Sequence, residues 1–150
     1  AKPVPINPSN FRNYRKDLFF VSIAGVTVNF ILAFFCFPLS ELLLMIPIYS
    51  EAVLVVVQFF YYLFYFMFQI NMTLMVFNLL PIPPLDGYHV AQCLFMNAKT
   101  YKFFGFVEKY SYVILVAVLI INSRTHFLNT IVYWLMMPLM NLASLILSIF

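Results

Sequence analysis

The chain reads Phe77-Asn78-Leu79-Leu80-Pro81-Ile82-Pro83-Pro84-Leu85-Asp86-Gly87 at its centre. This stretch closes a run of 34 uncharged residues that lies between Glu51 and Asp86. As helix, about 20 apolar residues cross the roughly 30 Å of hydrocarbon in a bilayer, so the run is longer than one span needs. The sequence therefore predicts a membrane span over about residues 52–80 and a segment of a different kind after it.

Three prolines, at positions 81, 83 and 84, decide what that segment is. Proline lacks a backbone N–H and restricts the residue before it, so a regular helix cannot continue. We expect the chain to run extended here, at or near membrane depth, where non-helical backbone needs protein or a watery cavity around it. A carboxylate at that depth costs about 2.5–3.5 kcal/mol on insertion scales and usually marks a functional site. Asp86 is therefore the leading candidate functional residue.

The composition predicts an all-α integral membrane protein, because 65% of the 150 residues are hydrophobic and only 9% are charged. We expect a single transmembrane domain, residues 1–150, formed by a bundle of about four helices with a proline-rich break in or after the second. Pro38 is expected to stop the first span. The expected elements are an extended membrane-proximal segment at 1–16 and spans at about 18–37, 52–80, 103–122 and 127–150.

The placement of the charges predicts an orientation. Basic residues precede the first expected span and follow the second, whereas the loop between these spans carries Glu41 and Glu51; the basic residues are Lys2, Arg12, Arg15, Lys16, Lys99, Lys102 and Lys109. By the positive-inside rule, the N-terminal segment and the Asp86 end of the second span face the cytoplasm. Scattered cations that flank spans suit a lipid bilayer as partner and do not suit a nucleic acid.

Small and polar side chains within the spans mark helix contacts. One stripe at helical spacing is formed by Ser22, Gly25, Asn29, Ala33 and Cys36. In lipid, small residues allow close helix approach and an Asn can hydrogen-bond across the contact, so Gly25 and Asn29 are expected to face a protein neighbour. Cys36 and Cys93 match no metal or disulfide spacing and are interpreted as packing residues.

Two asparagines and a histidine could belong to a site around Asp86. Asn71 and Asn78 lie seven residues apart on one helix face and need polar partners. They either hold neighbouring helices together or support Asp86. His89 follows Asp86 by three residues, so both side chains could in principle touch a metal, although a polar histidine at a membrane border is common.

The Phe77–Gly87 segment closely resembles the second signature of the site-2 protease family of intramembrane zinc metalloproteases. Three further pieces follow the order of that family: Ala1-Lys2-Pro3-Val4-Pro5-Ile6-Asn7, Arg15-Lys16-Asp17, and Ala24-Gly25 with Asn29. The resemblance implies that Asp86 is the third protein ligand of a catalytic Zn²⁺. It also implies that Asn78, Asn71, Pro81, Pro83, Pro84 and Gly87 support the active site or contact the substrate, a helix of a membrane protein.

The chain departs from the family pattern in two places. Val26 stands where the family usually has proline, which affects only local helix shape. More importantly, the 150 residues contain no H-E-x-x-H, the motif whose two histidines bind zinc and whose glutamate is the general base. The resemblance therefore predicts the C-terminal part of a bacterial or archaeal cell-membrane zinc metalloendopeptidase. The chain begins at Ala1 and looks like the continuation of something longer, and by itself it is expected to be inactive.

Two other functions remain open from the sequence. An inactive homologue could bind membrane helices as a partner, in which case no H-E-x-x-H would precede the chain. A small transporter component could use Asp86, Asn71 and Asn78 to line a polar path, which would require flux that depends on Asp86.

Overall fold

The computed structural model describes residues 13–147, and every regular element in that range is a helix. The elements are α1 (Tyr14–Leu43), α2 (Glu51–Asn78), α3 (Asp86–Phe95), α4 (Tyr101–Lys109), α5 (Ser111–Thr125) and α6 (Phe127–Leu147). The expected all-α membrane fold is confirmed. The segment Ala1–Asn7 and residues 148–150 of the last expected span lie outside the described residues.

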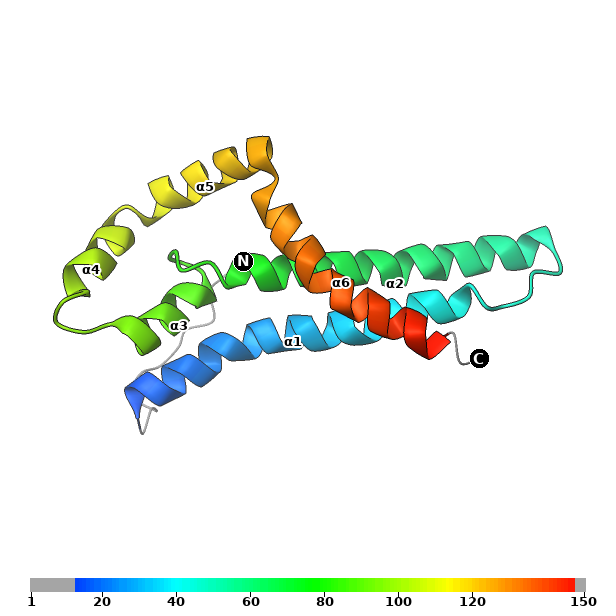
Figure 1. Ribbon diagram of the computed structural model, residues 1–150, viewed down its shortest axis with the longest axis horizontal. Helices are drawn as coiled ribbons and strands as arrows, with labels where there is room; N and C mark the ends of the chain where they lie inside the picture. The colour runs from blue at the N-terminus through cyan, green and yellow to red at the C-terminus, as the bar shows by residue number, and fades with distance from the viewer. Residues whose placement is uncertain (1–12, 148–150) are drawn as a thin grey trace.

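The long helices α1 and α2 pair side by side as a hairpin, and α6 crosses both of them (Figure 1). The core lies where the three helices meet. Ala33 of α1 and Phe68 and Met72 of α2 are completely buried there, and the ring centroids of Phe37 and Phe68 are 4.8 Å apart. Buried Leu128, Val132 and Met136 of α6 complete this cluster. Cys36 is part of it, as its interpretation as a packing residue requires.

Helix α1 is longer at both ends than expected. It begins at Tyr14, so the predicted extended segment cannot include residues 14–16. Asn13 caps it: its side chain accepts a hydrogen bond from the backbone N–H of Lys16, and the Asp17 carboxylate accepts one from the backbone N–H of Asn13. At the other end the helix passes through Pro38 to Leu43. The expectation that Pro38 stops it is wrong. Proline inside a helix removes one backbone hydrogen bond and crowds the carbonyl four residues earlier, which can kink a helix without ending it, and buried Phe37 and Ser40 continue the packing of α1 through this point.

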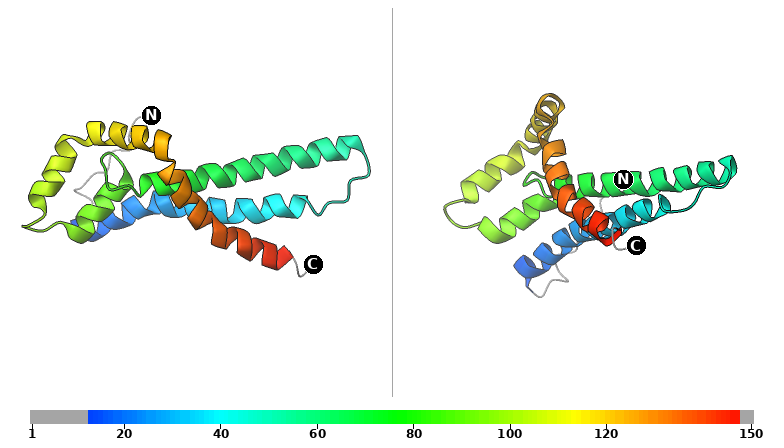
Figure 2. Two further views of the ribbon diagram at one scale, coloured as in Figure 1. Left: turned by 45° about the horizontal axis from the view of Figure 1, so that its top comes forward. Right: turned by 45° about the vertical axis from the view of Figure 1, so that its right-hand side comes forward.

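The predicted third span, residues 103–122, is not one straight helix. It is divided into α4 and α5, which meet at Tyr110 with a bend of 76°. Phe104 and Val107 of α4 pack on Tyr88 of α3, and the half-buried Ile114 of α5 packs against the same cluster, whereas Ser111 is the only fully buried residue of α5. Figure 2 shows the resulting arch of α4 and α5, which leads away from the hairpin before α6 returns across it.

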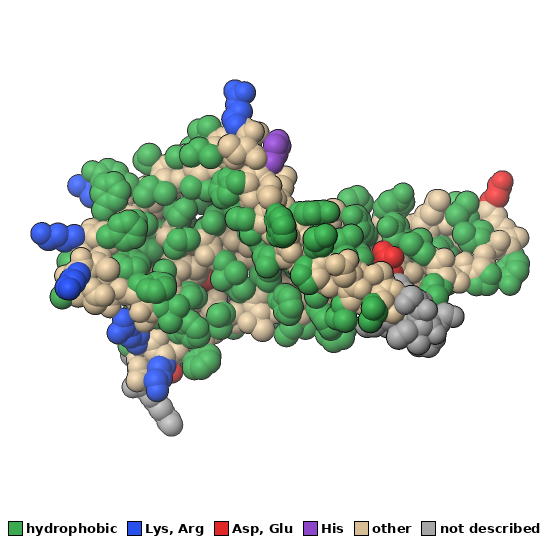
Figure 3. Space-filling view, viewed as in Figure 1, with side chains coloured by type: hydrophobic (Ala, Val, Ile, Leu, Met, Phe, Trp, Pro, Cys, Tyr) green, Lys and Arg blue, Asp and Glu red, His purple; other side chains and the backbone are tan. Residues whose placement is uncertain are grey.

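Within the described residues, α1 and α2 are long and apolar enough to cross a membrane, and the bent α4–α5 pair raises the number of candidate spans to three. Four spans remain a prediction. Large apolar side chains point outward along these helices, for example Phe35, Phe59 and Val113, which are 61%, 62% and 68% exposed. A surface of this kind suits contact with lipid. Most of the cations gather near the start of α1 and around α3 and α4, and a further one stands beside the histidine at the top of the view; acidic groups lie toward the opposite end of the hairpin (Figure 3).

Candidate metal centre

The proline-rich break does not run extended as predicted; it folds into consecutive turns. After α2 ends at Asn78, the backbone N–H of Ile82 donates to the carbonyl of Leu80 at 2.8 Å, and that of Leu85 donates to the carbonyl of Ile82 at 2.9 Å. Ile82 is 8% exposed and anchors the loop. These turns satisfy backbone groups locally, which extended backbone could not do. As a result, α3 starts beside the end of α2.

Gly87 permits this return of the chain. A Cβ atom built on Gly87 would collide with the backbone of Leu79 and lie 2.6 Å from the carbonyl oxygen of Leu80. Both neighbours are backbone atoms at the helix end, so they cannot swing aside as a flexible side chain would. Only glycine therefore allows the first turn of α3 to rest on the last turn of α2.

Asp86, the first residue of α3, lies against Gly25 of α1. A Cβ atom on Gly25 would be 3.4 Å from Oδ2 of Asp86, so the absence of a side chain at position 25 leaves room beside the carboxylate. The Asp86 side chain is half-buried. This burial raises the pKa of its carboxyl group, and the neighbouring His89 acts in the opposite direction. Gly25, predicted to face a protein neighbour, faces the leading candidate residue.

Two contacts define how α3 packs on α1. The Arg15 guanidinium donates to the carbonyl of Met96 at 2.8 Å near the start of α1 and the end of α3, and Gly25 meets Asp86 further along α1. The two helices are therefore antiparallel. Each helix also carries one buried polar atom without a hydrogen-bond partner in the described chain, Oγ of Ser22 on α1 and Nδ1 of His89 on α3. The sequence marks both residues as candidates, but no sequence pattern predicts that Ser22 and His89 act together.

The other predicted site residues take different positions. Asn71 donates from Nδ2 to the carbonyl of Met67 in its own helix at 2.7 Å. Asn78 is half-buried at the last position of α2, immediately before the break. Asn29 is half-buried on α1. Of the prolines in the break, Pro83 is half-buried and Pro81 and Pro84 are exposed. The contact between Asp86 and Gly25 is thus the best-defined part of the site.

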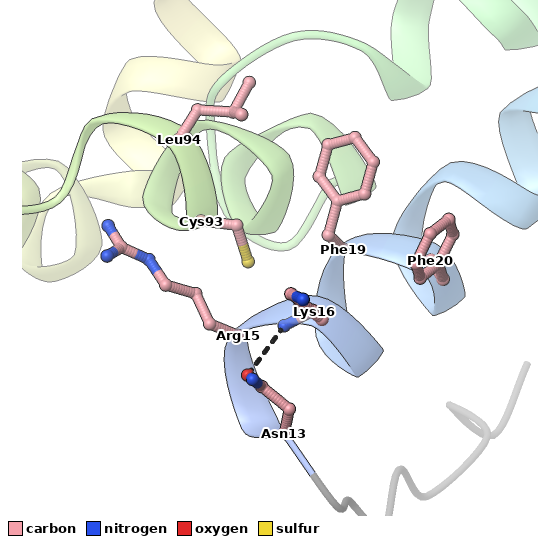
Figure 4. A pocket seen from close by; sticks show the side chains of 7 residues that line it. All are labelled: Asn13, Arg15, Lys16, Phe19, Phe20, Cys93 and Leu94. Carbon is pink, nitrogen blue, oxygen red and sulfur yellow. Dashed lines mark hydrogen bonds between the residues drawn. The ribbon is translucent and has the colours of Figure 1, made fainter.

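An open groove of about 510 Å³ lies beside the start of α1, on the same side as α3 (Figure 4). It is lined by Asn13, Arg15, Lys16, Phe19, Phe20, Cys93 and Leu94. Neither Asp86 nor His89 lines it, so this groove is separate from the candidate metal centre.

Asp86 fits a zinc site as one ligand. Its carboxylate oxygens are donors that Zn²⁺ accepts, and the neighbouring Gly25 leaves space on one side. A catalytic zinc takes about three protein ligands and one open position. Within residues 13–147, no three His, Cys, Asp or Glu side chains are grouped to hold a metal ion. Any zinc here would need ligands in addition to those of the described chain.

Comparisons with known proteins agree with the family resemblance of the proline-rich segment. The sequence model of peptidase family M50 matches residues 11–122. A protein of Bacillus subtilis (strain 168) named "Putative zinc metalloprotease YwhC" is 39% identical over 99 residues. That match covers 63% of this chain, and the chain spans only 42% of the length of the relative. No solved structure matches the chain significantly.

Proposed function

Because the chain belongs to peptidase family M50, the site-2 protease family, we propose that it forms the C-terminal part of an intramembrane zinc metalloprotease. In this proposal Asp86 is the third protein ligand of the metal. Two histidines and a general-base glutamate come from an H-E-x-x-H helix outside the 150 residues, since the chain contains no such motif. The chain by itself is then inactive.

One observation carries the proposal. The turns of the break and the bare backbone of Gly87 place the Asp86 carboxylate at the start of α3, against the open side of Gly25. A carboxylate held in this way at the end of a membrane span supports its assignment as a metal ligand. The Asp86 side chain is half-buried, so part of it stays accessible to further ligands.

When bound, zinc supplies Lewis acidity for hydrolysis of a peptide bond. The residues of this chain supply position and access. Asp86 holds the metal, and the non-helical residues 79–85 provide polar backbone near membrane depth, where water is otherwise scarce. Asn78 stands at the entry to the break, and its amide can hydrogen-bond the backbone of a locally unwound substrate. The substrate proposed is a transmembrane or membrane-proximal segment of another membrane protein.

The proposed location is the cell membrane of a bacterium or archaeon, with the Asp86 end toward the cytoplasm. Lys99 and Lys102 follow α3, and Arg15 and Lys16 begin α1, so these four cations lie at the Asp86 end of the hairpin. Glu51 begins α2 at the opposite end. This asymmetry is the one that the positive-inside rule associates with a cytoplasmic face.

The test uses the complete protein, with its upstream residues, purified in detergent. We expect Asp86→Ala to abolish stoichiometric zinc binding and cleavage of a membrane-protein substrate, while the helical circular dichroism is retained. Metal content is measured by elemental analysis and cleavage by gel electrophoresis.

Glu51→Gln is the matched control, because it also removes a carboxylate but lies at the far end of α2. Glu51→Gln should leave both the zinc content and the cleavage of the substrate unchanged. Full activity of Asp86→Ala would remove Asp86 from the site. A native protein that binds no zinc would instead favour an inactive homologue that acts as a membrane binding partner.

A further inference from the structure

One polar atom on α1 and one on α3 are buried without a hydrogen-bond partner among the described residues. Ser22 is 2% exposed, and its Oγ has no hydrogen-bond partner among the described residues. Nδ1 of His89 is likewise buried and unpartnered there. A buried polar group that stays unpaired costs about 1–3 kcal/mol. Two such atoms in one small interface indicate a shared hydrogen-bond arrangement.

The packing register places these two residues opposite each other. Arg15 meets Met96, and ten residues later Gly25 meets Asp86, ten residues earlier on the antiparallel α3. Ser22 precedes Gly25 by three residues, and His89 follows Asp86 by three. Positions three apart share a helix face. Continued at the same register, Ser22 and His89 lie next to the Asp86–Gly25 contact and opposite each other in the α1–α3 interface.

We propose that Ser22 and His89 form a hydrogen-bonded link, closed through one buried water, that positions Asp86 as a zinc ligand. The inference rests on the proposed function. A water between two buried polar groups serves both of them, and such bridges are nearly as favourable as direct hydrogen bonds. Ser22 lies on a long helix of the core, so the link fixes the first turn of α3 to a rigid element.

Asp86 depends on such support because its own helix start provides little. The N-cap position of α3 is Leu85, which offers no side-chain cap. Residues around a metal ligand commonly orient it, and their loss lowers metal affinity about 10–100-fold. In this arrangement His89 is a positioning residue, one turn from the ligand, and Ser22 is the anchor on α1.

The test measures the zinc dissociation constant of the complete protein by competition with a chromogenic chelator. We expect Ser22→Ala and His89→Leu each to weaken zinc binding about tenfold or more. The double variant should be no weaker than the worse single variant, because both changes break one link. His89→Asn keeps a polar atom near the place of Nδ1 and should restore most of the affinity, but only when Ser22 is present.

Ser40→Ala is the matched control. Ser40 is also a completely buried serine of α1, but its hydroxyl donates to the carbonyl of Phe37 in its own helix at 2.6 Å. This variant should leave zinc affinity unchanged.

Two results would overturn this inference and leave the proposed function standing. One is wild-type zinc affinity in both Ser22→Ala and His89→Leu. The other is a lowered melting temperature of these variants with unchanged zinc affinity, which would show a purely structural role. A wild-type protein that binds no zinc would overturn the proposed function, and the inference with it.

Discussion

Gly87 is the position where a single added methyl group is expected to do the most damage. Its Cβ would collide with backbone at the end of α2, including the carbonyl oxygen of Leu80 at 2.6 Å. We expect Gly87→Ala to lower the free energy of unfolding by about 3 kcal/mol and to weaken zinc binding, because α3 must shift together with Asp86. Thermal unfolding and zinc titration of the complete protein measure both effects.

The same substitution at the other end of the comparison, Gly105→Ala, is not expected to lower the free energy of unfolding. A Cβ atom on Gly105 meets nothing within 4 Å, and the residue lies inside α4. Alanine is favoured over glycine in a helix by about 1 kcal/mol, so this variant should be as stable as the wild type or slightly more so. Equal stability of the two variants would contradict the close approach described for Gly87.

At the level of the helices, Tyr88 is the buried side chain of α3 in its contact with α4. Tyr88 is 2% exposed, and its hydroxyl oxygen lies 3.3 Å from the carbonyl oxygen of Phe104 and 3.4 Å from a carboxylate oxygen of Glu108, two acceptors for its one proton. We expect Tyr88→Phe to cost about 1 kcal/mol of stability. Tyr112→Phe, at a tyrosine that is 75% exposed, should cost nothing measurable. Chemical unfolding of the two variants distinguishes a real contact from an incidental one.

The same contact predicts a dependence on pH. Burial, and then the Glu108 carboxylate, raises the pKa of the Tyr88 phenol. The contribution of Tyr88 is therefore fully present below the ordinary tyrosine pKa of about 10 and is lost only as the pH rises through the higher value in the folded protein. A stability difference between wild type and Tyr88→Phe that disappears well below that pH would contradict this assignment.

The sequence predicted the helices better than their ends. Apolar runs were sufficient to place α1 and α2, because length and hydropathy alone decide whether a helix can span a bilayer. The continuation through Pro38 and the bend at Tyr110 depend on tertiary contacts. In the same way, the motif around Asp86 indicated the site, but the closeness of Gly25 and the pairing of Ser22 with His89 depend on the register of α1 and α3, which no local pattern encodes.

For the whole molecule, the separation of charge along the hairpin predicts which end faces the cytoplasm. Lys99 follows α3 at the cation-rich end, and Glu51 begins α2 at the other. In a Cys93→Ser background, with Cys36 buried in the core, a single new cysteine can report on each end. We expect Lys99→Cys to react with a membrane-impermeant thiol reagent only after intact cells are opened, and Glu51→Cys to react in intact cells, because cytoplasmic loops carry the excess of Lys and Arg. The reverse pattern would place Asp86 at the outer face and would contradict the proposed orientation, while leaving the contact between α1 and α3 intact.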